Sequence, residues 1–226
     1  MKDIDLQLET TTLWDFPKQN YGEKKHGDNK YPGVTPAFII WNLIQRYTKP
    51  GDLVVDPMCG SGTTIDVCLE EKREVMGFDI VPYREDIIQS DSRNLPVESN
   101  IADFIFIDSP YSDNIHYNNH PDDIGKISCE NEKFFCELES VAKELFRILK
   151  RRKYLAWLIG DQSQKRKFVP VGARLYYILT QFFKPVDWVC VTRHNQTSNT
   201  GLWHYRAKKF NFFLRGFKHL LIMQKE

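Results

Sequence analysis

The stretch DLVVDPMCGSGTT, residues 52–64, joins a short apolar run to a glycine-rich turn. Residues 52–56 predict a buried strand, and residues 63–71 predict a helix after the turn. A glycine-rich turn in this position lets a ligand come close to the backbone and to the helix N-terminus. The turn has neither the third glycine of a dinucleotide-binding fingerprint nor the lysine of a P-loop. It therefore predicts a ligand other than a phosphate, although a tight strand-to-helix connection alone needs similar glycines.

A carboxylate belongs to the same turn, because Asp56 stands four residues before Gly60. This spacing suits a ligand that carries a cationic amino-acid group. The candidate ligand contacts in the turn are Asp56, Pro57, Cys59, Gly60, Gly62, Thr63 and Thr64.

Strands and helices alternate along the rest of the chain. Apolar runs predict strands over residues 74–79, 102–108, 154–161, 186–193 and 217–224. Helical spacing of apolar residues predicts helices over residues 35–47, 130–149 and 173–183. Such alternation predicts an α/β fold with a mostly parallel sheet covered on both faces. No repeat or Gly/Ser linker divides the chain, so residues 1–226 are expected to form one domain with a polar, loosely ordered N-terminal arm over residues 1–34.

Two acidic positions follow the glycine-rich turn. Asp79 ends the predicted strand 74–79, where a carboxylate can accept hydrogen bonds from two ribose hydroxyls. Asp91 and its neighbour Ser92 lie shortly beyond, and the Asp91 carboxylate can accept from an adenine amino group. The alternative for both acids is a solvated loop position.

The tetrapeptide Asp108-Ser109-Pro110-Tyr111 ends the apolar run 102–108. An exocyclic amine on a base is a poor nucleophile because its lone pair is delocalised into the ring. Asp108 and the Ser109 carbonyl can each accept one amino hydrogen if Pro110 holds the turn rigid, which directs the lone pair toward a methyl donor. Tyr111 offers an aromatic face on which an extruded base can stack. Alone, the motif is also compatible with a strand-ending turn and a packed tyrosine.

Together these motifs resemble those of the amino-type DNA methyltransferases, which methylate adenine N6 or cytosine N4. Residues 56–64 are similar to the family's cofactor loop, and residues 108–111 to its catalytic tetrapeptide. The resemblance covers roughly residues 10–165. It implies a Rossmann-like fold that ends in an antiparallel hairpin, S-adenosylmethionine as cofactor and DNA as substrate. It also places Thr35 and Pro36 near the methionine end of the cofactor.

The sequence departs from the family pattern in both motifs. Ser109 replaces the usual second proline, but only its carbonyl is needed. Met58 and Cys59 replace an aromatic and a small residue, and Cys59 is expected to be a packing residue and not a nucleophile. The resemblance implies direct methyl transfer without a metal, and Asp108 in the first tetrapeptide position favours adenine N6 over cytosine N4.

Charge is distributed unevenly along the chain. Residues 1–144 carry 14 Lys/Arg against 27 Asp/Glu, and residues 145–226 carry 17 against 3. Residues 193–219 hold six Lys/Arg and no acid, interleaved with aromatic residues, which suits contact with phosphates and bases. For the uneven charge, the alternative is that the acidic and basic halves of the chain neutralise each other where they are in contact. For the basic and aromatic segment, the alternative is that residues 194–216 are a long connection between two strands whose aromatic side chains are buried. The predicted DNA contacts are Arg193, Trp203, Arg206, Lys208 and Lys209.

Other functions and partners are constrained but not all excluded. An RNA base-amine methyltransferase is the nearest alternative, and a catalytically silent DNA-binding subunit is another; the intact Asp108, Pro110 and Tyr111 argue against silence. No apolar run approaches the ~20 residues needed to cross a membrane, and the five cysteines form no CxxC pair, so a cytoplasmic location is expected. A second copy of the chain and a cognate restriction endonuclease stay open as partners.

An irregularity is predicted after Asp79. Only residues 80–85 separate it from the apolar segment 86–90, whereas a parallel crossover needs about a dozen residues or more. We therefore predict that the crossover helix is missing and that residues 86–90 form an extended or very short edge segment, leaving the sheet one strand short or frayed. The N-terminal arm, with Leu13, Trp14 and Phe16, or a second copy is expected to cover Ile87 and Ile88.

Overall fold

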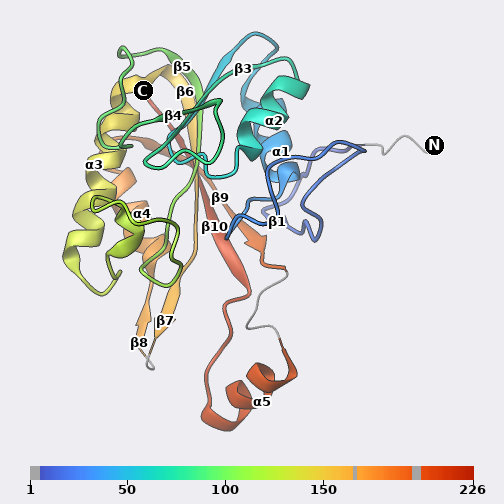
Figure 1. Cartoon of the computed structure of the whole chain (residues 1–226), viewed down its shortest axis with the longest axis vertical. Helices are drawn as coiled ribbons and strands as arrows, with labels where there is room; N and C mark the ends of the chain where they lie inside the picture. Colours follow the sequence, from blue (N-terminus) through green and yellow to red (C-terminus); the bar gives the residue numbers. More distant parts are fainter. Residues whose placement is uncertain (1–5, 165–166, 195–199) are drawn as a thin grey trace.

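The computed structural model describes residues 6–164, 167–194 and 200–226. Within them, eight strands form one sheet in the order β1-β9-β10-β6-β5-β2-β3-β4 (Figure 1). The strands are β1 (Leu13–Trp14), β2 (Leu53–Asp56), β3 (Glu74–Asp79), β4 (Ile87–Gln89), β5 (Ala102–Asp108), β6 (Leu149–Ile159), β9 (Lys184–Thr192) and β10 (Phe217–Gln224). A separate hairpin is formed by β7 (Gln162–Gln164) and β8 (Lys167–Val169). Among the described strands of the sheet, only β10 runs antiparallel to its neighbours.

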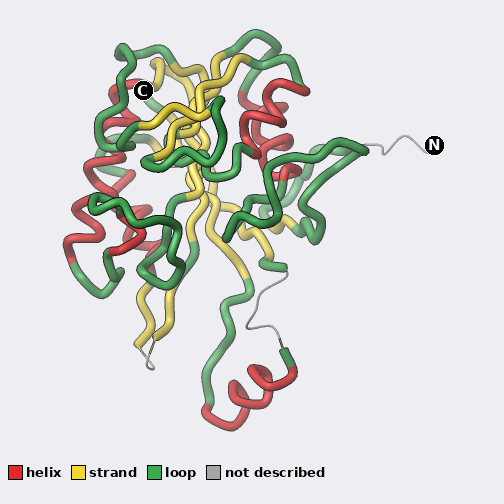
Figure 2. The backbone as a smooth tube through the Cα atoms, viewed as in Figure 1, coloured by secondary structure: helices red, strands yellow, loops and turns green. Residues whose placement is uncertain are grey.

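Helices cover both faces of this sheet (Figure 2). The helices on the sheet are α1 (Ala37–Tyr47), α2 (Thr63–Glu70), α3 (Glu132–Ile148) and α4 (Val171–Leu179). Helix α5 (Gly201–Phe210) stands away from the sheet, and residues Ile124–Lys126 form a short 3-10 turn. One apolar cluster packs α1 and α2 on one face, and a second packs α3 and α4 on the other. The predicted α/β, Rossmann-like architecture is therefore confirmed. Among the described helices, none has both the length and the apolarity needed to span a bilayer.

The predicted strands agree closely with the structure where a strand is buried on both faces. Strands β3, β5 and β10 have the predicted bounds. Strand β6 begins earlier, at Leu149, because α3 passes directly into it. The β7–β8 hairpin and α5 were not predicted, since their residues are largely polar or exposed and show no apolar period.

The irregularity after Asp79 is confirmed in part. No helix lies between β3 and β4, and β4 is a three-residue edge strand. The sheet is not one strand short, however, because Ile87 and Ile88 pair in parallel with Gly77 and Phe78 of β3. Residues 80–86 make this crossover without a helix, which shows that a very short parallel strand needs less connecting chain than a full one.

The described part of the N-terminal arm, residues 6–34, is ordered and lies elsewhere than predicted. Leu13 and Trp14 form β1, which pairs with β9 at the edge opposite β4. The arm therefore does not cover Ile87, which instead packs beside Cys59 in a small apolar cluster. The arm pairs with β9, which would otherwise be an unpaired edge strand. This position also buries Trp14 in the apolar cluster beside α1.

Candidate active site

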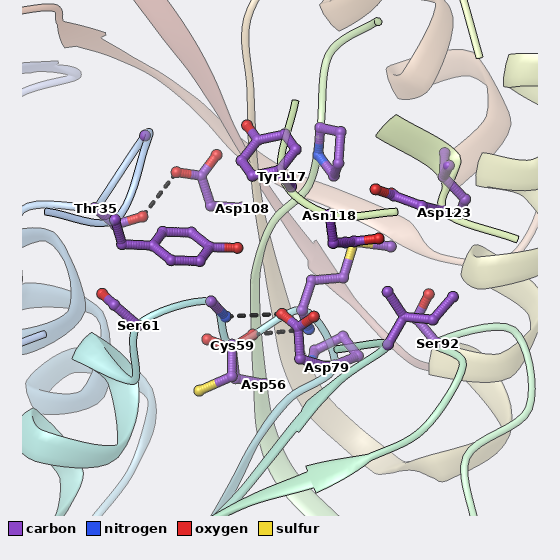
Figure 3. Close-up of a pocket in the computed structure, with 18 of the residues that line it drawn as sticks. Thr35, Asp56, Cys59, Ser61, Asp79, Ser92, Asp108, Tyr117, Asn118 and Asp123 are labelled. Carbon is purple, nitrogen blue, oxygen red and sulfur yellow. Dashed lines mark hydrogen bonds between the residues drawn. The ribbon is translucent and has the colours of Figure 1, made fainter. Parts of the chain in front are cut away.

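A pocket opens where the carboxyl ends of β2, β3 and β5 meet (Figure 3). The glycine-rich turn lines one part and the tetrapeptide another, so the two motifs share one cavity. The lining includes Thr35, Asp56, Pro57, Cys59, Gly60, Thr63, Thr64, Asp79, Asp91, Ser92, Asp108, Pro110 and Tyr111. Of the predicted cofactor and catalytic residues, Pro36, Gly62 and Ser109 do not line it.

The turn after β2 needs its glycines for backbone reasons. Gly60 and Gly62 have φ angles of 51° and 85°, which other residues rarely adopt. A Cβ on Gly60 would lie 2.9 Å from the ring of Tyr31, which closes over the turn from the N-terminal arm. Glycine at these two positions therefore permits the backbone of the turn, and at Gly60 it leaves room for the Tyr31 ring.

Asp56 is buried at the base of this turn, only 3% exposed. It accepts hydrogen bonds from the Thr64 hydroxyl at 2.5 Å and from the Met58 N–H at 3.1 Å. Burial away from water raises the pKa of Asp56 to about 7, and the nearby Asp79 and Asp108 add to the rise. A cationic group in the pocket would favour the ionised carboxylate.

Asp79, at the end of β3, is tied to the turn. Its Oδ2 accepts from the Gly60 N–H at 3.0 Å and its Oδ1 from the Val81 N–H at 3.1 Å. Burial raises the pKa of this carboxyl as well. A carboxylate has about four lone-pair sites, so Asp79 keeps acceptor capacity for a ligand hydroxyl.

Asp91 and Ser92 line the pocket, and the Asp91 carboxylate already has a partner. It forms a bidentate pair with Arg93, which also contacts Glu137 at 2.6 Å. Asp123, which was not predicted, is buried and lines the same wall. Its side chain accepts from the Gly125 N–H at 2.8 Å, a turn motif that gave no signal in the sequence.

Asp108 projects into the pocket from the end of β5. Its Oδ2 accepts from the Thr35 hydroxyl at 2.7 Å and contacts the Lys218 Nζ at 2.9 Å. Its Oδ1 lies 3.4 Å from the Tyr111 hydroxyl. The contact with Lys218 was not predicted, because 110 residues separate the two in the sequence.

The rest of the tetrapeptide is held rigidly. The Ser109 hydroxyl turns into the core and accepts from Trp157 Nε1 at 2.9 Å. The Tyr111 ring lies so close to Gly160 that a Cβ there would be 3.0 Å from the ring. This packing fixes the aromatic face beside Asp108.

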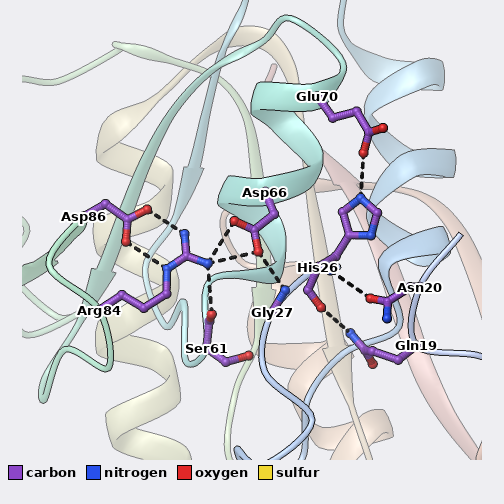
Figure 4. A network of polar contacts seen from close by, with 9 residues as sticks. All are labelled: Gln19, Asn20, His26, Gly27, Ser61, Asp66, Glu70, Arg84 and Asp86. Carbon is purple, nitrogen blue, oxygen red and sulfur yellow. Dashed lines mark hydrogen bonds and ion pairs between the residues drawn. The ribbon is translucent and has the colours of Figure 1, made fainter. Parts of the chain in front are cut away.

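The N-terminal arm forms one wall of the pocket and is anchored to α2 (Figure 4). The buried His26 contacts Glu70 through Nε2 at 2.7 Å, and the Gly27 N–H donates to Asp66 at 2.7 Å. Gln19 donates to the Thr35 carbonyl at 2.7 Å. The arm that was predicted to be loosely ordered is therefore, over its described residues, a structural part of the site.

The predicted DNA contacts lie in two places. Trp203, Arg206, Lys208 and Lys209 lie on α5, which has no buried residue and stands away from the sheet where β9 ends and β10 begins (Figure 1). The Arg206 guanidinium lies 5.2 Å from the Trp203 ring centroid, so the two kinds of side chain form one surface. Arg193 instead lies near the pocket, 6.0 Å from the Tyr111 ring. Part of the predicted segment 194–216, residues 195–199, falls outside the described residues.

The uneven charge is partly neutralised inside the molecule. Lys150 and Lys153 of β6 pair with Asp103, and Lys153 also pairs with Asp52, so basic and acidic halves meet at the far end of the sheet. Helix α5 carries basic side chains and no acidic one.

The fold is that of the S-adenosylmethionine-dependent methyltransferases. A solved enzyme of that class from Methanosarcina mazei superposes with a TM-score of 0.51 at 16% identity, covering 81% of this chain and 96% of that one.

Within this class, the sequence of residues 4–90 matches the model of the N6/N4 DNA methylase family. The chain is 31% identical over 90 residues to the DNA adenine methyltransferase YhdJ of Escherichia coli, covering 40% of this chain and 29% of that protein. It is 30% identical over 87 residues to the type II methyltransferase M.MjaII of Methanocaldococcus jannaschii, covering 36% of this chain and 16% of that protein. These matches confirm the resemblance to the amino-type DNA methyltransferases. The matched part spans under a third of the length of either relative.

Proposed function

We propose that this protein transfers a methyl group from S-adenosylmethionine to an exocyclic amine of a base in DNA. The observation that carries the proposal is the shared pocket, which places Asp108 and Tyr111 beside the glycine-rich turn and Asp79. One end of the cavity suits the cofactor and the other suits an amine, at a separation set by neighbouring strands.

The residues of the turn fit the cofactor. The buried Asp56, whose described partners are uncharged donors, suits a cationic amino-acid group. Asp79 suits two ribose hydroxyls, and the glycine backbone permits close approach. Asp91 and Ser92 are proposed to contact the adenine, with Arg93 orienting the Asp91 carboxylate. When bound, the cofactor supplies an electrophilic methyl group on a sulfonium.

The tetrapeptide suits the amine. Asp108 accepts one amino hydrogen and the Ser109 carbonyl the other, so that the nitrogen lone pair points into the pocket. Tyr111 stacks with the base, which must leave the DNA double helix to reach a side chain as buried as Tyr111. Orientation of two reactants in this manner supplies much of the rate without covalent catalysis.

Helix α5 is proposed to contact the DNA. Its exposed Trp203 and Tyr205 and its basic Arg206, Lys208 and Lys209 combine stacking surfaces with cations. It projects from the end of the sheet at which Asp108 lies, because the carboxyl end of β5 and the beginning of β10 are at that same end. Duplex DNA held by α5 would therefore meet the pocket mouth.

The proposed amine is adenine N6. The aspartate in the first tetrapeptide position and the similarity to YhdJ, named a DNA adenine methyltransferase, both favour adenine over cytosine N4.

The test is methyl transfer from labelled cofactor to duplex DNA and, in parallel, to tRNA. The proposal predicts label in the duplex and none in tRNA. Label in tRNA alone would favour the RNA methyltransferase alternative, and label in neither would favour a silent subunit.

A further inference from the structure

We propose that Lys218 is a positioning residue for Asp108. Together with Thr35 it holds one carboxylate oxygen, so that the other oxygen faces the substrate amine. This inference rests on the proposed function and adds a residue that neither motif contains.

Strand register brings the two residues to one face. Asp108 is opposite Leu158 of β6, and Leu158 is opposite Leu220 of β10. Side chains at paired positions share a face, and so do residues two apart along a strand. Lys218, two residues before Leu220, therefore lies on the face of Asp108. This face is covered by α1, and Thr35 lies just before α1 begins.

The contacts are short and shielded from water. Lys218 Nζ and Thr35 Oγ1 lie 2.9 and 2.7 Å from the same Asp108 Oδ2. The side chains of Lys218 and Asp108 are 13% and 10% exposed, so their attraction is screened little by solvent. Asp108 Oδ1 has the longer contact of 3.4 Å to Tyr111, which leaves lone pairs for an amino hydrogen.

The next residue fixes the start of β10. Trp188 Nε1 donates to His219 Nδ1 at 3.0 Å, and His219 Nε2 lies 3.0 Å from Asp161 Oδ2. A Cβ on Gly172 of α4 would lie 2.2 Å from the His219 ring, so the ring fills the space against that helix. Because successive side chains point to opposite faces, anchoring His219 on the α4 face holds Lys218 on the other.

A phosphate contact is the obvious alternative for a lysine in this basic segment. The cations of α5 differ, because that helix has no buried residue, whereas Lys218 is enclosed and paired with the proposed catalytic acid. Positioning predicts a loss in turnover, whereas phosphate contact predicts a loss in DNA affinity. The two roles are therefore separable.

The kinetic experiment compares Lys218→Met and Lys218→Arg with the wild type. The matched control is Lys150→Met, since Lys150 Nζ pairs with Asp103 Oδ2 at 2.8 Å at the other end of β5. We expect Lys218→Met to lower kcat about tenfold or more, with KM for DNA and cofactor affinity within about twofold. Lys218→Arg should recover most of the turnover, and Lys150→Met should not change it. Wild-type turnover in Lys218→Met, or a raised KM at unchanged kcat, would overturn the proposal.

A second measurement does not depend on activity. Crystal structures of the wild type and Lys218→Met should show the Asp108 carboxylate bound to Thr35 in the former and rotated in the latter. An unmoved carboxylate would overturn the positioning role. If the wild type methylated no nucleic acid, the proposed function would fail while these structures would still decide the role of Lys218.

Discussion

The Thr64 hydroxyl donates a hydrogen bond to Asp56 Oδ2 across the glycine-rich turn, at 2.5 Å. Burial nevertheless raises the pKa of Asp56 to about 7, since one hydroxyl and one amide do not replace the hydration that burial removes. A cationic cofactor group would pair with the ionised form. We expect cofactor affinity to rise as the pH increases through about 7, measured by calorimetry on either side of that pH. Asp56→Asn should bind weakly with a flatter profile; a wild-type affinity independent of pH would contradict the role.

The same group links stability to pH. Its pKa in the folded state lies above the unfolded value of 3.8, so the folded protein binds more protons between about pH 4 and 7. The contribution of Asp56 to stability is therefore greatest at low pH and falls as the pH rises through this window. Denaturant unfolding at several pH values should show that the free energy of unfolding falls more steeply between about pH 4 and 7 in the wild type than in Asp56→Asn. If the free energy of unfolding changed equally with pH in the two proteins, Asp56 would already be ionised in the folded protein.

Asp79 and Asp108 should separate binding from turnover. Asp108→Ala is expected to abolish methyl transfer with cofactor affinity within a few-fold of wild type, because Asp108 addresses the amine. Asp79→Ala is expected to weaken cofactor binding first, because Asp79 holds the turn through Gly60. Cofactor titration and single-turnover assays measure the two effects, and near-normal turnover in Asp108→Ala would exclude the catalytic role.

Gly172 should be required for the packing of β10. A Cβ at this position would lie 2.2 Å from the His219 ring, so Gly172→Ala should destabilise the fold by about 1–3 kcal/mol. Gly201→Ala is the matched control, since its Cβ would meet nothing within 4 Å. Thermal unfolding of both variants measures the difference. Equal midpoints would show that the ring can move aside at no cost.

Helix α5 should set the salt dependence of DNA binding. Substituting Arg206, Lys208 and Lys209 by Gln should reduce the slope of log affinity against log salt by up to about three, at about 0.9 for each phosphate that these cations neutralise. The control replaces the exposed Lys72, in the turn between α2 and β3, and the exposed Lys133 and Lys143 of α3. A slope changed by the control and not by the α5 variant would place the DNA elsewhere.

The sequence predicted the parts of the site that local pattern determines. Asp56, Asp79 and Asp108 each end a buried parallel strand, so their meeting at one sheet edge follows from the fold. Lys218 and Tyr31 could not be predicted, because their contacts depend on the register of β10 and on the path of the arm. These are long-range features that no periodicity encodes.

Exposed elements were also missed, for a different reason. Helix α5 buries none of its residues, so it lacks the apolar stripe that makes a helix visible in a sequence. Its residues predicted a nucleic-acid contact through composition alone, and the structure adds that they share one projecting helix.

The most direct test of the proposed amine methylation is nucleoside analysis of DNA treated with the purified protein. We predict N6-methyladenine as the product in DNA treated with the wild type, and none with Asp108→Ala. N4-methylcytosine would preserve the amine mechanism and correct the base. 5-Methylcytosine would contradict the proposed mechanism, because methylation at carbon does not use an amine held by Asp108.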